Sequence, residues 1–275
     1  MKKLMTVSVI VILLAVVFLG QWHWKNELRH NLETAKAQMA QSPTDVEIED
    51  TGADNIDMNQ GMSSTEQTHD LEKLTKNLPD SLRDKVISAA NKQKPIQLVL
   101  AGGDHIQGLG GRLQQALDKA YGNHIFQVRE IAFIGKNSLF DVYQGKLYQK
   151  ITESKPDVVL FTSMLANDIG KVSTTDSARV PVLIGNELKK QNPAVDYLIE
   201  PSNPVTFNAG VNERVDKVKE EAQNSNIPYL DHMSRWPEGQ DLSKVLKPNG
   251  STPNKDGMKI WSDFLSDYFT GKKVD

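Results

Sequence analysis

Apolar runs rich in β-branched residues alternate with amphipathic segments along residues 79–275. The runs have the length of buried strands and the amphipathic segments that of helices, an alternation typical of a parallel sheet covered by helices. The predicted strands are 96–101, 126–133, 157–162, 195–200 and, more briefly, 227–230. The predicted helices are 79–91, 109–120, 139–153, 182–191, 211–225 and 254–269. We therefore expect an α/β fold, a three-layer α/β/α sandwich with a mainly parallel five-stranded sheet.

The most apolar part of the chain is its first 24 residues. After Lys2 and Lys3, residues 4–24 contain no Asp, Glu, Lys or Arg, and at about 1.5 Å per residue a helix of this length spans a bilayer core of about 30 Å. No A-x-A-like cleavage site follows, and Trp22 and Trp24 are typical of a membrane interface. We expect residues 1–24 to form an uncleaved signal anchor, a single transmembrane helix. A cleaved signal peptide and a buried core helix are the alternatives.

Two basic residues before the apolar segment predict its orientation. The positive-inside rule places Lys2 and Lys3 in the cytoplasm and everything after Trp24 outside. The expected localisation is the cell membrane, single-pass, with an extracytoplasmic C-terminal domain. Cleavage would instead give a secreted protein.

The next segment is polar and acidic. Residues 40–70 contain eight Asp and Glu residues and no Lys or Arg, and large apolar side chains are scarce between residues 25 and 70. Such a composition buries too little apolar surface to offset the entropy lost on ordering. We expect an extracytoplasmic linker over residues 25–78 and a folded domain over 79–275. An acidic segment that binds a basic partner is the alternative.

Composition excludes several classes of function. The net charge is only −3, so the chain is not a general nucleic-acid binder. It has no cysteine, which excludes disulfides, a thiolate nucleophile and a zinc-thiolate site. No His/Asp/Glu spacing supports a metal site either. We expect neither metal nor cofactor.

In an open parallel sheet, ligands bind at the carboxyl ends of the strands, so the loops there are the candidate site. The first of these, AGGDHIQGLGG, is rich in glycine and precedes a helix, and backbone N–H groups in such a loop can hold an anion. It lacks the Lys-Ser/Thr of a P-loop and the third glycine of the dinucleotide motif. Nucleotide binding is therefore not expected.

Taken together, the loops resemble those of the SGNH/GDSL hydrolases, particularly small exported members from Gram-positive bacteria. The resemblance spans residues 96–269 and predicts a flavodoxin-like sheet. Four segments carry it, in order: LVLAGGDHIQG, IAFIGKNSLFD, PDVVLFTSMLANDIG and NGSTPNKDGMKIWSDFL. In that family a serine in the first segment attacks an acyl carbonyl, and an aspartate and a histidine in the last activate it. Gly135 and Asn167 match the glycine and asparagine that hold the oxyanion.

The three triad positions depart from the family pattern. The nucleophile position falls on Asp104 if the segment is aligned on Gly108, and on His105 if it is aligned on the Gly-Asp pair. Asn249 stands at the aspartate position and Thr252 at the histidine position. Removing one triad member costs on the order of 10⁴ to 10⁶ in kcat. The resemblance therefore predicts a catalytically degenerate member.

Three functions remain open at this stage. The first is an anchored domain that binds a cell-envelope glycan or acylated polymer without hydrolysing it. The second is an active esterase or carbohydrate O- or N-deacetylase in which Asp104 and His105 replace the triad and Asn167 polarises the carbonyl. The third is a structural partner in envelope or exopolysaccharide assembly.

Three further residues carry weaker expectations. His232 is expected to be structural, because a lone histidine is weak evidence for catalysis. Trp261 lies on the apolar face of the last predicted helix and is expected in the core. Trp236, in SRWPEG, is the better candidate for stacking on a sugar or capping the cleft.

Overall fold

The computed structural model describes residues 64–135, 137–207 and 210–274. They belong to one compact unit, which extends over Gly61–Asp275. Its helices are α2 (Ser64–Thr75), α3 (Asp80–Lys92), α4 (Leu109–Tyr121), α5 (Leu139–Gln144), α6 (Gln149–Glu153), α7 (Leu165–Asp168), α8 (Thr174–Gln191), α9 (Val211–Asn224) and α10 (Lys255–Phe269). Short 3₁₀ helices are η1 (Asp104–Ile106), η2 (Met233–Arg235) and η3 (Gly239–Val245).

The predicted signal anchor, residues 1–24, lies outside the described residues. Within the part of the chain that is described, no helix has both the length and the apolar character needed to cross a membrane.

The sheet has four strands, all parallel, in the order β2-β1-β3-β4. They are β1 (Ile96–Gly103), β2 (Phe126–Phe133), β3 (Val158–Thr162) and β4 (Asp196–Glu200). The register aligns Gly103 with Phe133 and Thr162 with Glu200, so the strands finish at one edge of the sheet. The parallel α/β prediction is confirmed, and the loops after β1, β2, β3 and β4 share that edge.

A fifth strand was expected over 227–230, and this prediction is wrong. The segment forms a single parallel bridge, between Tyr229 and Ile199 of β4. Ile199 donates its N–H to the Pro228 carbonyl and accepts from Leu230 N–H. The rungs on either side would need N–H donors from Pro228 and Pro201, and proline has none. The two prolines therefore limit the pairing to one residue.

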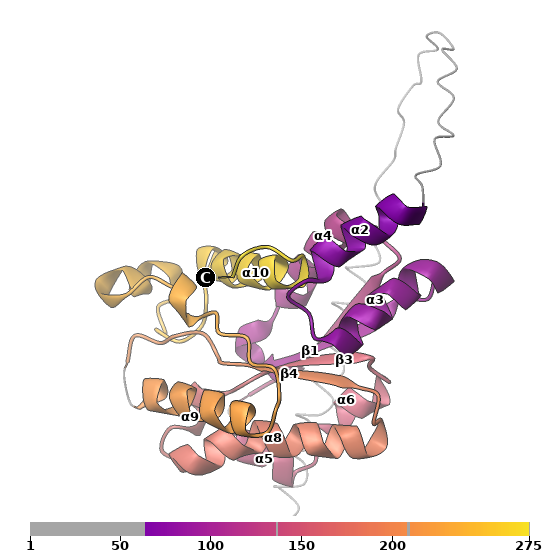
Figure 1. Ribbon diagram of the computed structural model, residues 1–275. Coiled ribbons are helices and arrows are strands. Elements are labelled where there is room, and N and C mark those ends of the chain that lie inside the picture. The colour runs from indigo at the N-terminus through magenta and orange to yellow at the C-terminus, as the bar shows by residue number, and fades with distance from the viewer. Residues whose placement is uncertain (1–63, 136, 208–209, 275) are drawn as a thin grey trace, which may run out of the picture. The chain divides into compact units, whose positions relative to one another are not determined.

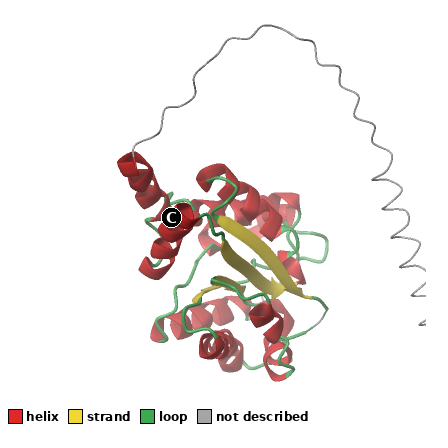
Figure 2. Ribbon diagram, turned by 90° about the vertical axis from the view of Figure 1, so that its right-hand side faces the viewer, coloured by secondary structure: helices red, strands yellow, loops and turns green. Residues whose placement is uncertain are grey.

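Helices cover both faces of the sheet, which gives the predicted three layers (Figures 1 and 2). Alternate residues of β1 point to opposite faces. Leu98 and Leu100 pack in one core with α3, α4 and α10, while Val99 and Ala101 pack in a second core with α5, α8 and α9. Both cores are closed to solvent, so the strand ends are rigidly supported.

Two predicted helices differ from those in the structure. The segment 139–153 is two short helices, because the chain turns between α5 and α6 at Gly145 and at Lys146, whose φ is +53°. Helix α8 begins eight residues before the predicted start at 182. Ser173 caps it by accepting from Asp176 N–H, and the helix continues through Pro181.

Helix α2 lies inside residues 25–78, the range predicted as a linker. Leu71 packs against the core, and Thr75 is fully buried. Tyr121 Oη donates to the Leu74 carbonyl of α2 at 2.9 Å and to the Phe269 carbonyl of α10. The end of that range therefore belongs to the folded unit, because its few apolar residues fall on one helical face.

Candidate functional site

A small cavity opens at the carboxyl edge of the sheet. Its volume is about 30 Å³, and Asp104, His105, Asn167 and Thr252 are among its lining residues. The other lining residues are Met164, Ala166, Ser202, Asn203, Val205 and Ser251. The structure thus brings together four of the six residues singled out in the sequence. Gly135 and Asn249 lie outside this lining.

The glycine-rich segment after β1 holds an anion that belongs to the protein itself. The N–H groups of Gly108 and Gly110 both donate to the Glu130 carboxylate of β2, each at 3.0 Å to Oε2. Gly108 has a φ of +88°, which only glycine adopts without strain. These two backbone donors are therefore already paired within the protein.

Asp104 and His105 begin the 3₁₀ helix η1, and their side chains differ in environment. Asp104 is exposed. The imidazole of His105 stacks on Trp261, with ring centres 5.9 Å apart and planes inclined by 11°. Its Nε2 atom is buried and forms no hydrogen bond with any described residue. Burial lowers the pKa of His105 to about 4, against the opposing effects of Asp104 and the Ser163 backbone, so the ring is neutral at pH 7.

The loop before α10 is held by Asn249. Its Oδ1 accepts from the N–H groups of Ser251 and Thr252, at 3.1 and 3.0 Å, and its Nδ2 donates to Thr252 Oγ1 at 2.8 Å. Asn254 then caps α10 by accepting from Asp256 and Gly257 N–H. The two side chains at the expected aspartate and histidine positions therefore touch, but neither can take up a proton near neutral pH.

The loops after β2 and β3 are bonded to each other. Asn167 in α7 donates through Nδ2 to the Asn137 carbonyl at 3.0 Å. Asp168 is fully buried and accepts from Leu139 N–H at 2.7 Å and from Ser177 Oγ at 2.6 Å. Gly135, in the same loop as Asn137, has a φ of +102°. In this structure the Asn167 amide thus braces the neighbouring loop.

Solved structures of similar fold were found, although no family model and no curated protein matches this chain. A lipase/acylhydrolase from Enterococcus faecalis is 13% identical with a TM-score of 0.51, over 62% of this chain and 93% of that one. A lipolytic protein assigned to the G-D-S-L family from Desulfitobacterium hafniense is 15% identical, with a TM-score of 0.50 over 62% and 98%. A carbohydrate esterase family 3 protein from Talaromyces cellulolyticus is 14% identical, with a TM-score of 0.50 over 64% and 94%.

This chain has the SGNH/GDSL hydrolase fold. At such low identity the likeness concerns the fold, and the residues at the edge of the sheet decide the chemistry. Both alignments of the first segment place a residue other than serine at the cavity of this SGNH fold, since Asp104 and His105 both line it. Among the described residues, no group of three His, Asp or Glu side chains could hold a metal ion.

Sequence reasoning missed a buried polar network beneath the cavity. Glu200, the last residue of β4, is fully buried and accepts from Thr162 Oγ1 at 2.6 Å and from Trp261 Nε1 at 3.2 Å. Burial raises its pKa to about 7, although the two hydrogen bonds act in the opposite direction. The sequence did contain one signal for this network, because a carboxylate ends the otherwise mostly apolar run VDYLIE. The network fixes Trp261, and with it the stacked His105.

His232 completes the packing around Trp261. Its Nδ1 accepts from Trp236 Nε1 at 2.9 Å, so its Nε2 carries the proton and donates to the Pro201 carbonyl at 3.0 Å. The ring lies 4.8 Å from Trp261 between centres, and burial lowers its pKa to about 4. Both ring nitrogens are paired in the core, as expected for a structural histidine. Trp261 is fully buried, as expected, and Trp236 is 5% exposed.

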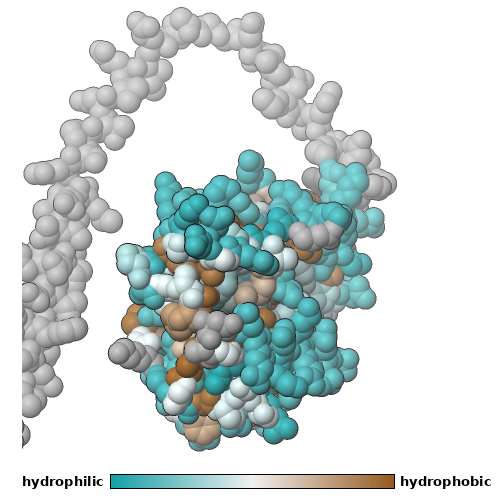
Figure 3. All heavy atoms as spheres, turned by 90° about the vertical axis from the view of Figure 1, so that its left-hand side faces the viewer, coloured by the Kyte–Doolittle hydropathy of each residue, from teal (hydrophilic) through white to brown (hydrophobic). Residues whose placement is uncertain are grey.

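The rim around the strand ends carries apolar side chains. Ile134, after β2, is 68% exposed, and Phe207, after β4, is 44% exposed. On the face of the molecule shown in Figure 3, which is the left-hand side of Figure 1, apolar surface forms a band between hydrophilic regions. Exposed apolar surface of this kind favours contact with a ligand or partner.

Proposed function

We propose that this chain is a membrane-anchored extracytoplasmic protein that binds an acylated cell-envelope glycan at the cavity where the SGNH hydrolases carry out acyl transfer, without hydrolysing it. One observation supports the proposal: the cavity keeps polar groups that can hold a ligand, while among the described residues no hydroxyl of its lining donates to His105. The apolar residues 4–24 support the anchor, and the loops that resemble the family support the class of ligand.

The case against hydrolysis rests on the groups at the cavity. Acyl transfer by this fold needs a nucleophile with an adjacent base that a carboxylate orients. Thr252 and Asn249 supply neither charge nor basicity, and one N–H of the Asn167 amide is engaged by the Asn137 carbonyl. His105 is neutral, and its ring, which lines the cavity, is stacked on Trp261. No hydroxyl donates to it among the described residues.

The case for binding rests on two unpaired polar atoms. His105 Nε2 and Ser202 Oγ are buried, and neither forms a hydrogen bond with the described residues, although both residues line the cavity. A buried polar group without a partner costs about 1–3 kcal/mol. An acetyl carbonyl accepts from the Ser202 hydroxyl, and a neighbouring sugar hydroxyl both donates and accepts. The cavity has room for about one water-sized group, so the acetyl oxygen would enter it while the sugar lies at its rim.

The test uses the full-length chain purified in mild detergent. Hydrolysis of p-nitrophenyl acetate and of acetylated xylo-oligosaccharides is measured beside a protein-free blank. Binding of the acetylated oligosaccharide and of its de-O-acetylated counterpart is measured by calorimetry. Turnover at the blank level and preferential binding of the acetylated form are expected. Ser202→Ala should weaken that binding, whereas Ser225→Ala, an exposed serine on the C-terminal side of α9, should not.

Two results would overturn the proposal in different ways. Turnover that is lost in Asp104→Ala, His105→Ala and Asn167→Ala would assign a rearranged hydrolase. Absence of both turnover and binding would favour a purely structural partner in envelope assembly. The anchor is tested separately, by carbonate extraction of membranes and by the mass of the mature chain, since cleavage removes the first residues.

A further inference from the structure

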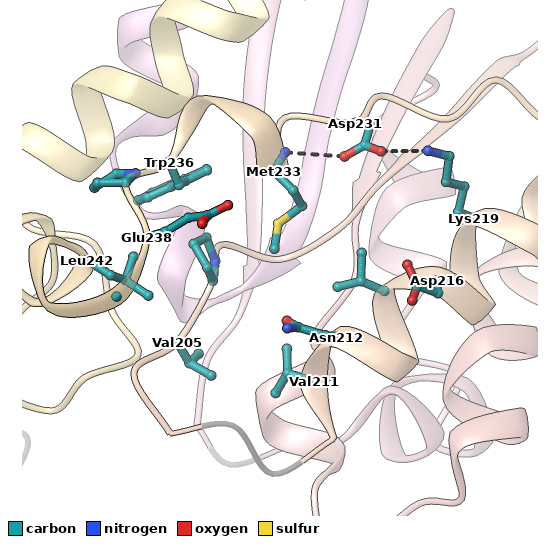
Figure 4. Close-up of a pocket in the computed structure, with 14 residues that line it drawn as sticks. Val205, Val211, Asn212, Asp216, Lys219, Asp231, Met233, Trp236, Glu238 and Leu242 are labelled. Carbon is teal, nitrogen blue, oxygen red and sulfur yellow. Dashed lines mark hydrogen bonds and ion pairs between the residues drawn. The ribbon is translucent and has the colours of Figure 1, made fainter.

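A second, larger groove lies between α9 and the segment 231–242 (Figure 4). Its volume is about 630 Å³, within the roughly 300–1,000 Å³ typical of small-molecule sites. Val205 lines both this groove and the small cavity, so the two are neighbours with separate linings otherwise. The groove therefore has the size of a binding site and lies beside the one described above.

One part of the groove is apolar. Val211 of α9 faces it from one wall, while Met233, Trp236 and Leu242 face it from the other (Figure 4). Trp236 is held in place by its hydrogen bond to His232. Apolar and aromatic side chains on fixed supports suit the C–H faces of a sugar ring, whose hydroxyls project sideways.

The other part is acidic. Lys219 pairs with Asp231 at 2.8 Å, and Asp231 also accepts from Met233 N–H (Figure 4). Asp216 on α9 and Glu238 on the opposite wall form no ion pair with any described residue. Both also line the groove. Three carboxylates against one ammonium give the groove a negative potential, which attracts cationic ligands.

We propose that this groove binds a glycan whose sugars carry free amino groups, such as a β-1,4-linked glucosamine oligosaccharide. The ammonium groups pair with Asp216 and Glu238, the hydroxyls bond to these carboxylates and to Asn212, and the ring faces pack on Met233 and on the small part of Trp236 that lines the groove. The inference goes beyond the acylated-glycan site, which shares only Val205 with the groove and needs a different group on the sugar.

The test compares three probes on the full-length protein: the glucosamine trisaccharide, its fully N-acetylated form, and trilysine. Binding is followed by calorimetry and Trp fluorescence at low and moderate salt. We expect the glucosamine trisaccharide to bind most tightly. Asp216→Asn and Glu238→Gln should each weaken it about threefold, and together about tenfold, the range for single exposed charge pairs. Asp84→Asn, an exposed carboxylate on α3, serves as the matched control and should leave binding unchanged.

The outcomes that overturn the inference are distinct. Equal binding of the N-acetylated form with the same loss in Asp216→Asn would assign a neutral-sugar site, and equal binding of trilysine would assign a peptide site. If the glucosamine trisaccharide does not bind, or if its binding is insensitive to both substitutions, the proposed ligand is wrong. Ser202→Ala separates the two sites, because it should reduce binding of acetylated glycan and leave the glucosamine trisaccharide unaffected.

Discussion

The side-chain amide of Asn249 donates a 2.8 Å hydrogen bond to the hydroxyl of Thr252. These two residues stand where the last segment of an SGNH hydrolase is expected to carry its aspartate and histidine. The loop thus retains a side-chain contact between the two positions, while the groups that make the contact useful for proton transfer are absent. The contact is one of three hydrogen bonds that Asn249 makes within the loop, and it therefore contributes to the stability of the loop.

Asn249→Ala should therefore destabilise the protein. The substitution leaves Ser251 N–H, Thr252 N–H and the Thr252 hydroxyl without their partner, and we expect a loss of about 1–2 kcal/mol in the free energy of unfolding. Urea denaturation followed by circular dichroism measures it. Asn249→Asp keeps the accepting oxygen and should cost much less. Equal losses in the two variants would contradict this account of the loop.

Glu200 should make stability fall as the pH rises from about 4.5 through 7. Its pKa is raised from 4.5 to about 7 by burial, so the folded state holds a proton that the unfolded chain releases. The stability contributed by this group is fully present below pH 4.5 and is lost as the pH rises through 7, by about 3 kcal/mol in total. Glu200→Gln imitates the neutral carboxyl and should lose less stability than wild type between pH 5 and pH 8. Parallel pH profiles of urea denaturation would contradict the expectation.

His232 should stay neutral at pH values well below the ordinary pKa of histidine. Burial lowers its pKa from 6.5 to about 4, so the stability it contributes is present above pH 6.5 and is lost as the pH falls through 4. Nitrogen NMR at pH 6 should show a neutral ring with the proton on Nε2. His124, an exposed histidine before β2, provides the reference spectrum in the same sample. A titration midpoint for His232 near 6.5 would mean that the ring is not closed off as described.

Tyr121 should contribute to the attachment of α2. Its hydroxyl donates to carbonyls of both α2 and α10, so Tyr121→Phe should lower the free energy of unfolding by about 1 kcal/mol. Tyr143→Phe is the matched control, because the Tyr143 hydroxyl forms no hydrogen bond with a described residue. A chain that starts at residue 79 should be less stable than one that starts at residue 61. If the two chains denature at the same urea concentration, α2 contributes nothing to stability.

The fold followed from patterns that are local in the sequence. The apolar runs located four strands to within two residues at each end, because buried parallel strands read as continuous apolar segments. The start of α8 was predicted at 182, yet the helix begins at Thr174 and passes through Pro181. The limit of one bridge at Tyr229 depends on Pro201, which is 28 positions earlier in the chain. The two segments become neighbours only when the sheet forms, so a local pattern could not reveal this limit.

The candidate site was less readable than the fold. Asp104, His105, Asn167 and Thr252 could be placed together because they follow strands or precede the last helix. The groove could not be predicted in this way. Asp216 and Glu238 line the same groove only because α9 packs beside a loop that has no regular sequence pattern. The pairing of Glu130 with the glycine loop was hidden for the same reason, since the carboxylate comes from the neighbouring strand.

The bonding of Tyr121 to both α2 and α10 has a mechanical consequence. Tension that arrives along the chain from before residue 64 enters the domain through α2, and Tyr121 passes part of it to α10. That helix carries Trp261, which contacts Glu200, His105 and His232 under the cavity. A pull on the N-terminal side of the domain would thus reach α10 through the Tyr121 hydroxyl and through Asn77, which donates to the Asp267 and Tyr268 carbonyls, and would reach the site through Trp261.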